Sequence, residues 1–263
     1  MRLAVLLPAL AALLAGLPAL AQTSPAPTPQ QYTVRIVKTF PHDPQAFTEG
    51  LFYDKGFLYE STGRNGTSWI RKVDLDTGKV VQSAKVASAY FGEGIAAWKG
   101  RIISLTWRTE KGFVWDQSTL RLKSSFSYIG EGWGMTHDAQ NLIMSDGTPV
   151  LKFLDPDTLT VARQLMVTLD GKPLDQVNEL EYVDGAVLAN IWMTRDIVRI
   201  DPKSGQVNGI IDLSALPEES HPLNDRDAVA NGIAYDPVGK RLFVTGKLWP
   251  HLYQIELVPA AAQ

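Results

Sequence analysis

The chain has 263 residues, of which 45% are hydrophobic and 20% charged, and its formal net charge at pH 7 is −3. These values are ordinary for a globular protein of one or two domains. The small negative charge gives no electrostatic reason to bind nucleic acid or an anionic membrane surface. The chain contains no cysteine, which excludes cysteine nucleophiles, zinc–thiolate sites and stabilisation by disulfides.

The first 21 residues have the pattern of a secretory signal peptide. Arg2 supplies a positive charge, an apolar run follows, and Ala19-Leu20-Ala21 matches a small-x-small cleavage site. The alternative is an N-terminal membrane anchor, but two prolines and a glycine interrupt the apolar run. We therefore expect cleavage before Gln22 and a periplasmic or secreted protein that has no membrane contact after cleavage.

Residues 22–31 are rich in Pro, Ser, Thr and Gln, which predicts a disordered linker. From residue 32 the chain consists of short apolar or alternating runs that are separated by turn dipeptides, and no long segment has the period of a helix. This pattern predicts an all-β domain over residues 32–258, followed by a tail over residues 259–263.

The β domain contains five modules of about 45 residues, which is the repeat length of a propeller blade. Each module opens with a glutamate, an asparagine or a tryptophan, usually followed by glycine and then by an aliphatic residue. The five opening residues are Glu49, Glu93, Trp133, Asn178 and Asn231. A turn and a second strand follow, then a third strand, and in most modules a turn that begins with aspartate, the first at Asp76-Thr77-Gly78.

The fifth module lacks a fourth strand, and an unused strand, Tyr32–Val37, precedes the first module. If this strand is the outer strand of the last module, the ring closes and its edges are covered. We therefore predict a five-bladed β-propeller. A β-sandwich does not require a recurrence of about 45 residues, and a β-helix has a much shorter period.

The repeat places unusual residues on one face of the ring, because the start of the first strand and the end of the second lie side by side in a hairpin. The first position collects the five opening residues. Counting seven residues from each hairpin turn gives the second position: Gly63, Trp107, Trp192 and Gly246, with Lys247 directly after. This ring of positions carries a different chemical group in nearly every module, which indicates a binding site.

The residue types at these positions favour a small cationic or polar ligand in an aromatic cage, since tryptophan faces attract ammonium groups. Phe91 and the tryptophans around Glu93 predict a desolvated carboxylate with a raised pKa, which can carry protons near neutral pH. From the residues alone, an enzyme and a binding protein both remain open.

Eight short motifs occur along the β domain: AFTEGL at 46–51, FGEGI at 91–95, LTW at 105–107, GWGMTHD at 132–138, VNELEY at 177–182, NIW at 190–192, NGIAYD at 231–236 and FVTGKLWP at 243–250. In this order, over about residues 33–257, they resemble the motifs of the glutaminyl-peptide cyclotransferase family of plant and bacterial type. The resemblance implies a five-bladed propeller that converts N-terminal glutaminyl residues to pyroglutamate and releases ammonia, without a metal ion or other cofactor.

By position, the resemblance implies that Glu93 is the acid/base catalyst, with Asn178 and Lys247 as polar partners. It implies an aromatic pocket of Phe47, Phe91, Trp107, Trp133 and Trp192. Plant members usually carry glutamine where this chain has Glu49, so a second carboxylate faces the pocket here and its titration can be coupled to that of Glu93. The implied partners are peptides or proteins with N-terminal Gln, and we expect a monomer.

Two alternatives belong to other functional classes. One is a non-catalytic propeller that binds amines or peptide N-termini, with Glu93 as counter-charge only. The other is a lactonase-like hydrolase, which requires a calcium-binding cluster of Glu, Asn and Asp in the central channel. Ammonia release from a Gln-initiated peptide, with and without a chelator, separates the three hypotheses.

Overall fold

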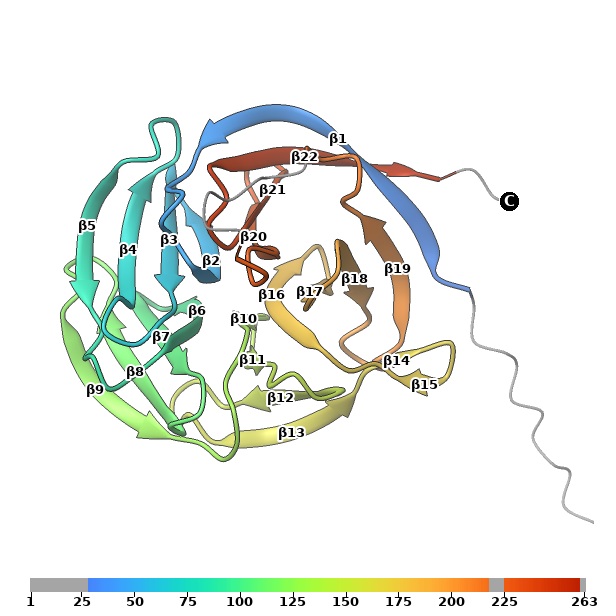
Figure 1. The fold of residues 1–263 in the computed structure, drawn as a ribbon. Helices are drawn as coiled ribbons and strands as arrows, with labels where there is room; N and C mark the ends of the chain where they lie inside the picture. Colours follow the sequence, from blue (N-terminus) through green and yellow to red (C-terminus); the bar gives the residue numbers. More distant parts are fainter. Residues whose placement is uncertain (1–27, 218–224, 261–263) are drawn as a thin grey trace, which may run out of the picture.

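A computed structural model describes residues 28–217 and 225–260 of the chain (Figure 1). This part is built from strands and turns, so the predicted all-β class is confirmed. Nowhere in the described ranges is there a helix long and apolar enough to cross a membrane. The predicted signal peptide, most of the predicted linker and part of the C-terminal tail lie outside the described residues.

Three of the sheets have four strands each, and every strand pairs with the next one along the chain in antiparallel order. The first contains β2 (Thr48–Asp54), β3 (Phe57–Thr62), β4 (Trp69–Asp74) and β5 (Val80–Lys85). The second contains β6 (Gly92–Trp98), β7 (Arg101–Thr106), β8 (Lys111–Asp116) and β9 (Leu122–Ser127). The third contains β10 (Met135–His137), β11 (Leu142–Met144), β12 (Val150–Leu154) and β13 (Val161–Met166).

The remaining large sheet has eight strands, in the order β16-β17-β18-β19-β1-β22-β21-β20. Its first half contains β16 (Val177–Val183), β17 (Ala186–Ile191), β18 (Asp196–Ile200) and β19 (Val207–Asp212). Its second half contains β20 (Ala230–Asp236), β21 (Arg241–Gly246), β22 (His251–Pro259) and β1 (Gln30–Pro41). A short hairpin of β14 (Thr168–Leu169) and β15 (Lys172–Pro173) precedes this sheet.

Strand β1 is the outer strand of the last four-strand unit, as predicted from the unpaired N-terminal strand in the sequence. It pairs antiparallel with β22 from Tyr32 opposite Pro259 to Pro41 opposite His251, and the blue and red strands run side by side in Figure 1. Its first residues also pair in parallel with β19, which merges the two halves into one sheet. The strand begins at Gln30, so the last two residues of the predicted linker belong to it.

The strands at the centre of Figure 1 form a closed ring. In order, β2 contacts β6, β6 contacts β10, β10 contacts β16, β16 contacts β20, and β20 contacts β2. Glycine permits this close approach: a Cβ on Gly50 would lie 2.6 Å from the backbone nitrogen of Ile95, and one on Gly134 would lie 2.1 Å from the carbonyl oxygen of Asn178. Side chains at these positions would push the inner strands apart.

The hydrophobic core consists of five clusters, each between two neighbouring four-strand units. Between the first two sheets, for example, fully buried Ile70 of β4 and Ile95 of β6 belong to one cluster. The cluster between the last and the first unit contains Phe40 of β1, Leu51 of β2 and Phe243 of β21. Fully burying one such side chain contributes about 1.5–3 kcal/mol, so the sheets are held together mainly at these interfaces.

One predicted turn is displaced by two residues. The aspartate that starts the first such turn is Asp74, whose Oδ1 accepts hydrogen bonds from the Thr77 amide at 2.9 Å and the Thr77 hydroxyl at 2.7 Å. The predicted residue, Asp76, is exposed and pairs with Lys38. The turns at Asp116 and Asp155 use the same arrangement, and Asp201 accepts from the Lys203 amide and the Ser204 hydroxyl. In all four turns the aspartate lies four residues before a glycine or leucine with positive φ.

Candidate active site

All nine predicted site residues line one cavity of about 330 Å³. They are Phe47, Glu49, Phe91, Glu93, Trp107, Trp133, Asn178, Trp192 and Lys247. Arg64 and Asp227, which the sequence did not single out, complete the lining. Residues from all five modules therefore meet at one end of the inner strands, although the role of each residue remains a prediction.

Irregularities in strand pairing set the direction of the side chains of the residues that open the modules. The register between the first and second strands of a module shifts at Glu49, at Glu93, at Asn178 and at Asn231. A β-bulge leaves a residue outside the regular ladder and changes the direction of its side chain. The same local irregularity therefore directs Glu49, Glu93 and Asn178 into the cavity, whereas the fully buried Asn231 amide donates to the Thr48 carbonyl.

The ends of the second strands are fixed by a repeated backbone hydrogen bond. The amides of Trp107, Trp192 and Lys247 donate to carbonyls that lie two residues before the opening residue of the same module. Lys247 therefore occupies the position equivalent to Trp107. The count from the hairpin turn had predicted Gly246 at this position. The count failed because four residues separate Asp236 from Arg241 in the fifth hairpin, whereas most other hairpins have two-residue loops.

The aromatic residues form two packed groups in the cavity wall. The Phe91 ring packs edge-on against Phe47, with centroids 6.2 Å apart, and lies 5.5 Å from Trp107. On the other side, Trp133 and Trp192 pack edge to face at 5.7 Å. Such contacts fix the rings beyond the effect of burial alone, so the wall is a preformed apolar surface.

Glu93 is 5% exposed and has a strongly perturbed carboxyl group. Burial raises the pKa of Glu93 well above its ordinary value, and the nearby carboxylates of Glu49 and Glu131 raise it further, while the ammonium of Lys247 opposes them. A carboxyl group with a raised pKa is suited to accept and return a proton near neutral pH.

Glu49 and Lys247 form a buried ion pair beside Glu93. The Lys247 ammonium lies 2.9 Å from Oε1 and 2.8 Å from Oε2 of Glu49, and 4.8 Å from the centre of the Phe47 ring. Burial raises the pKa of Glu49, against the effect of the Lys247 charge. Glu49 thus compensates the charge of the buried lysine, which a neutral glutamine at this position would not do.

Asn178 lines the cavity and contains a buried polar atom without a partner. Its side chain is 3% exposed, and Oδ1 has no hydrogen-bond partner within the described part of the chain. A buried amide oxygen without a partner is costly. A ligand with N–H groups would satisfy it.

Arg64 follows Gly63, the residue at the end of the second strand of the first module. Its guanidinium lies 4.2 Å from the centre of the Phe47 ring and pairs with Asp225. Its φ of +77° is unusual for a residue with a side chain. In the sequence, the one indication of a role for Arg64 is that it directly follows Gly63, a predicted second position. No sequence signal pointed to Asp227.

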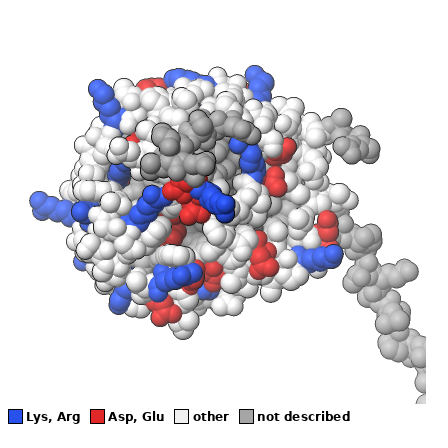
Figure 2. Space-filling model, in the orientation of Figure 1, with Lys and Arg blue, Asp and Glu red and all other residues white. Residues whose placement is uncertain are grey.

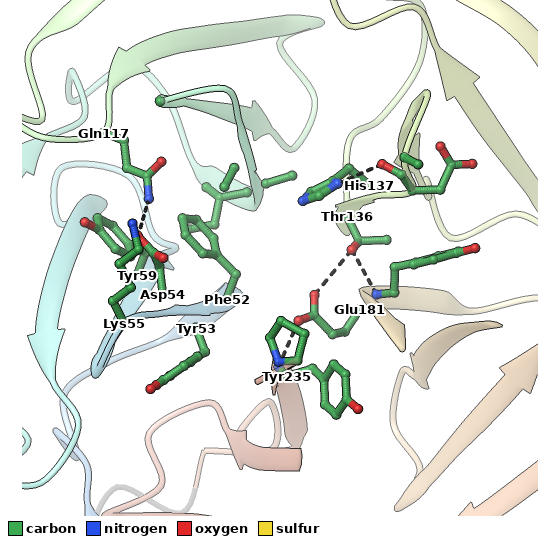
Figure 3. A pocket seen from close by; sticks show the side chains of 18 of the residues that line it. Phe52, Tyr53, Asp54, Lys55, Tyr59, Gln117, Thr136, His137, Glu181 and Tyr235 are labelled. Carbon is green, nitrogen blue, oxygen red and sulfur yellow. Dashed lines mark hydrogen bonds between the residues drawn. The ribbon is translucent and has the colours of Figure 1, made fainter. Parts of the chain in front are cut away.

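A larger cavity, of about 1020 Å³, lies at the other ends of the inner strands (Figure 3). It is lined by residues at and near the hairpin turns and by none of the predicted site residues. Glu181 points into the space between Thr136 and Tyr235 and accepts hydrogen bonds from the Thr136 hydroxyl and the Tyr235 amide. Burial raises the pKa of Glu181 to about 8.

Neither cavity contains an obvious ion site. Within residues 28–217 and 225–260, no group of three or more His, Asp or Glu side chains is arranged to hold a metal ion. Figure 2 shows Lys and Arg side chains interspersed with Asp and Glu on the face presented there, without a broad patch of one sign. The polar groups that line the smaller cavity are the carboxyl groups of Glu49, Glu93 and Asp227, the ammonium group of Lys247, the guanidinium group of Arg64 and the amide of Asn178, beside an aromatic wall.

Comparisons with known proteins agree on one family. The family profile described as glutamine cyclotransferase matches residues 9–257. A glutaminyl-peptide cyclotransferase of Arabidopsis thaliana is 44% identical over 233 residues, which are 88% of this chain and 73% of the relative. The crystal structure of a glutaminyl cyclase of Myxococcus xanthus superposes with a TM-score of 0.82 at 35% identity, and the match covers 88% of this chain and 99% of that chain.

Proposed function

Because the chain belongs to the glutamine cyclotransferase family, we propose that it is a glutaminyl-peptide cyclotransferase that converts N-terminal glutaminyl residues of peptides and proteins to pyroglutamate and releases ammonia. The family resemblance inferred from the motifs is confirmed. The observation that carries the proposed chemistry is the buried Glu93 carboxyl group in a cavity walled by Trp107, Trp133 and Trp192.

The aromatic wall holds the substrate in a reactive conformation. The reaction is intramolecular: the α-amine attacks the γ-amide carbonyl of the same residue, so the main task is to fold the side chain back onto the amine. Orientation of this kind can supply about 7–11 kcal/mol of a barrier. The rings of Trp133 and Trp192, fixed edge to face, provide a rigid surface for the folded side chain.

Glu93 transfers the proton between the two nitrogens. As the new bond forms between the α-nitrogen and the γ-carbon, the carboxylate takes a proton from the attacking amine. It then returns this proton to the side-chain nitrogen, which leaves as ammonia when the old carbon–nitrogen bond breaks. Such general acid–base transfer contributes about 10²–10⁴-fold to the rate, and the raised pKa of Glu93 allows both steps at one pH.

Lys247 and Asn178 stabilise the charge that develops on the γ-carbonyl oxygen. The Lys247 ammonium is held in place by Glu49, and the Asn178 amide lines the same cavity. Loss of one such donor typically costs about 10²–10³-fold in turnover. The unpaired Asn178 oxygen accepts an N–H of the substrate amine or amide.

The test is ammonia release from a Gln-initiated peptide, with and without a chelator, by the wild-type protein and by the Glu93→Gln variant. We expect turnover by the wild type that the chelator does not change, and a loss of at least about a hundredfold in the variant. The variant keeps the shape of the side chain, so its thermal unfolding should match that of the wild type. Cyclisation by the variant at near wild-type rate would contradict the role of Glu93.

We infer further that the sheets are the blades of a five-bladed propeller. The cyclic contacts of β2, β6, β10, β16 and β20 and the five clusters between neighbouring units support this interpretation. The eight-stranded sheet then counts as two blades that the start of β1 joins through β19. An experimental structure with another number of four-stranded units around the axis would contradict it.

We also propose that the protein is exported, cleaved before Gln22 and active as a monomer. The N-terminal sequence supports the export, and all nine predicted site residues come from one chain. Mass analysis of exported protein and light scattering in solution test these points. Retention of residues 1–21, or a stable dimer, would contradict them.

A further inference from the structure

Glu131 connects the two halves of the aromatic wall. Its Oε2 accepts a hydrogen bond from the indole nitrogen of Trp107 at 2.7 Å and another from that of Trp133 at 2.9 Å. These indoles belong to the two separate groups of packed rings, since Trp107 packs against Phe91 and Trp133 packs against Trp192. A single carboxylate oxygen therefore fixes the position of one group relative to the other.

The remaining oxygen of Glu131 is also occupied. Oε1 accepts a hydrogen bond from Nε of Arg108 at 2.9 Å, and the guanidinium of Arg108 lies 3.8 Å from the centre of the Trp107 ring. Burial acts to raise the pKa of Glu131, but the hydrogen bonds together outweigh it and lower the pKa, so the group is ionised at neutral pH. With three donors already bound, the carboxylate has little capacity left for a substrate.

We propose that Glu131 is a positioning residue that holds the indole rings of Trp107 and Trp133 in the geometry that the substrate requires. The inference rests on the proposed function, because it assigns these rings to the binding of the glutaminyl residue. Hydrogen bonds to an anion are about twice as strong as neutral ones. They also polarise the donor groups, which makes the indole faces more attractive to the substrate amine.

The position of Glu131 in the repeat agrees with this role. It lies two residues before Trp133, as Phe47 lies before Glu49 and Phe91 before Glu93. Phe47 and Phe91 line the cavity directly, whereas the equivalent residue of the third module is a carboxylate that acts through its neighbours. Glu131 is also one of the charged groups near Glu93, together with Glu49 and Lys247.

Two substitutions separate the hydrogen bonds of Glu131 from its charge. In Glu131→Ala the indoles lose their acceptor, and we expect KM for a Gln-initiated peptide to rise about tenfold or more, with a smaller change in kcat. In Glu131→Gln an oxygen acceptor remains but the negative charge is lost. We expect a smaller change in KM and a shift of the acidic limb of kcat/KM to lower pH, because the pKa of Glu93 falls.

The matched control is Glu256→Gln, which removes a carboxylate that pairs with Arg35 on the outer strands and should change neither KM nor the pH profile. Binding of the pyroglutamyl peptide, followed by tryptophan fluorescence, gives a readout that does not depend on turnover and should weaken in Glu131→Ala. Turnover by the wild type tests the proposed function separately. If Glu131→Ala keeps the wild-type KM and the wild-type affinity for the pyroglutamyl peptide, the positioning role is wrong, whatever the pH profile. If Glu131→Ala does not fold, a wild-type KM and affinity in Glu131→Gln, whose acceptor is no longer anionic, contradict the role in the same way.

Discussion

Glu49 sets the charge beside the proposed catalytic carboxylate. Its ion pair with Lys247 keeps two opposite charges in a buried site, while its own negative charge raises the pKa of Glu93. Removal of one partner of such a pair leaves the other charge uncompensated, which is a large change in a site of low polarity. The acid–base behaviour of Glu93 therefore depends on a residue that does not itself transfer the proton.

We expect Glu49→Gln to move the acidic limb of the kcat/KM profile to lower pH, by about one unit. The sign follows from two effects in the same direction: Glu93 loses a neighbouring negative charge, and the ammonium of Lys247 is no longer neutralised. Both favour the ionised form of Glu93, so activity persists further into the acid range.

The measurement is kcat/KM between about pH 4 and 9, where the acidic limb reports the free enzyme. Asp76→Asn, at an exposed pair with Lys38 far from the cavity, should leave the profile unchanged. A shift of the acidic limb to higher pH in Glu49→Gln would mean that the titrating group is not a carboxylate repelled by Glu49.

The site residues were predictable to different degrees from the sequence. Glu93, Trp107 and Trp192 stand at repeated positions where the residue type changes between modules, so the repeat alone brought them together. Phe91 was noted beside Glu93 in the sequence, whereas Phe47 entered only through the family resemblance. Glu131 and Asp227 were missed, because the chemistry of the first depends on two side chains from different modules and that of the second on a loop outside the strand pattern.

Among the elements, the strands were the most predictable part. The succession of strands within a module was predictable from apolar runs between turn residues, although the ladder between the third and fourth strands has a register shift in each of the first four modules. The bulges at the opening residues were not predicted, because a register shift depends on the packing of the inner strands around the axis. The second position in the fifth module was misplaced because the count assumed that all hairpin loops are equally long. The first turn was misplaced because the nearer of two aspartates, Asp76 instead of Asp74, was assigned to it.

At the scale of the molecule, the fold depends on how the ring is closed. The first and last strands of the chain pair through nine positions, so the edge of β22 is covered and the last unit obtains its outer strand. An uncovered edge strand would be a site for aggregation. Phe40 of β1 is 2% exposed and packs against Phe243 at 5.9 Å, which anchors the closing strand in the cluster between the last and first units.

We expect Phe40→Ala to lower the free energy of unfolding by about 3–5 kcal/mol, because it leaves a cavity at the interface where the ring closes. Val37→Ala on the same strand is the matched control, since Val37 is 43% exposed and its loss should change stability by at most about 0.5 kcal/mol. Urea unfolding followed by tryptophan fluorescence measures both variants. If the ring closes mainly through backbone pairing, the two substitutions will have similar small effects; a large loss confined to Phe40→Ala shows that side-chain packing of β1 holds the two ends of the chain together.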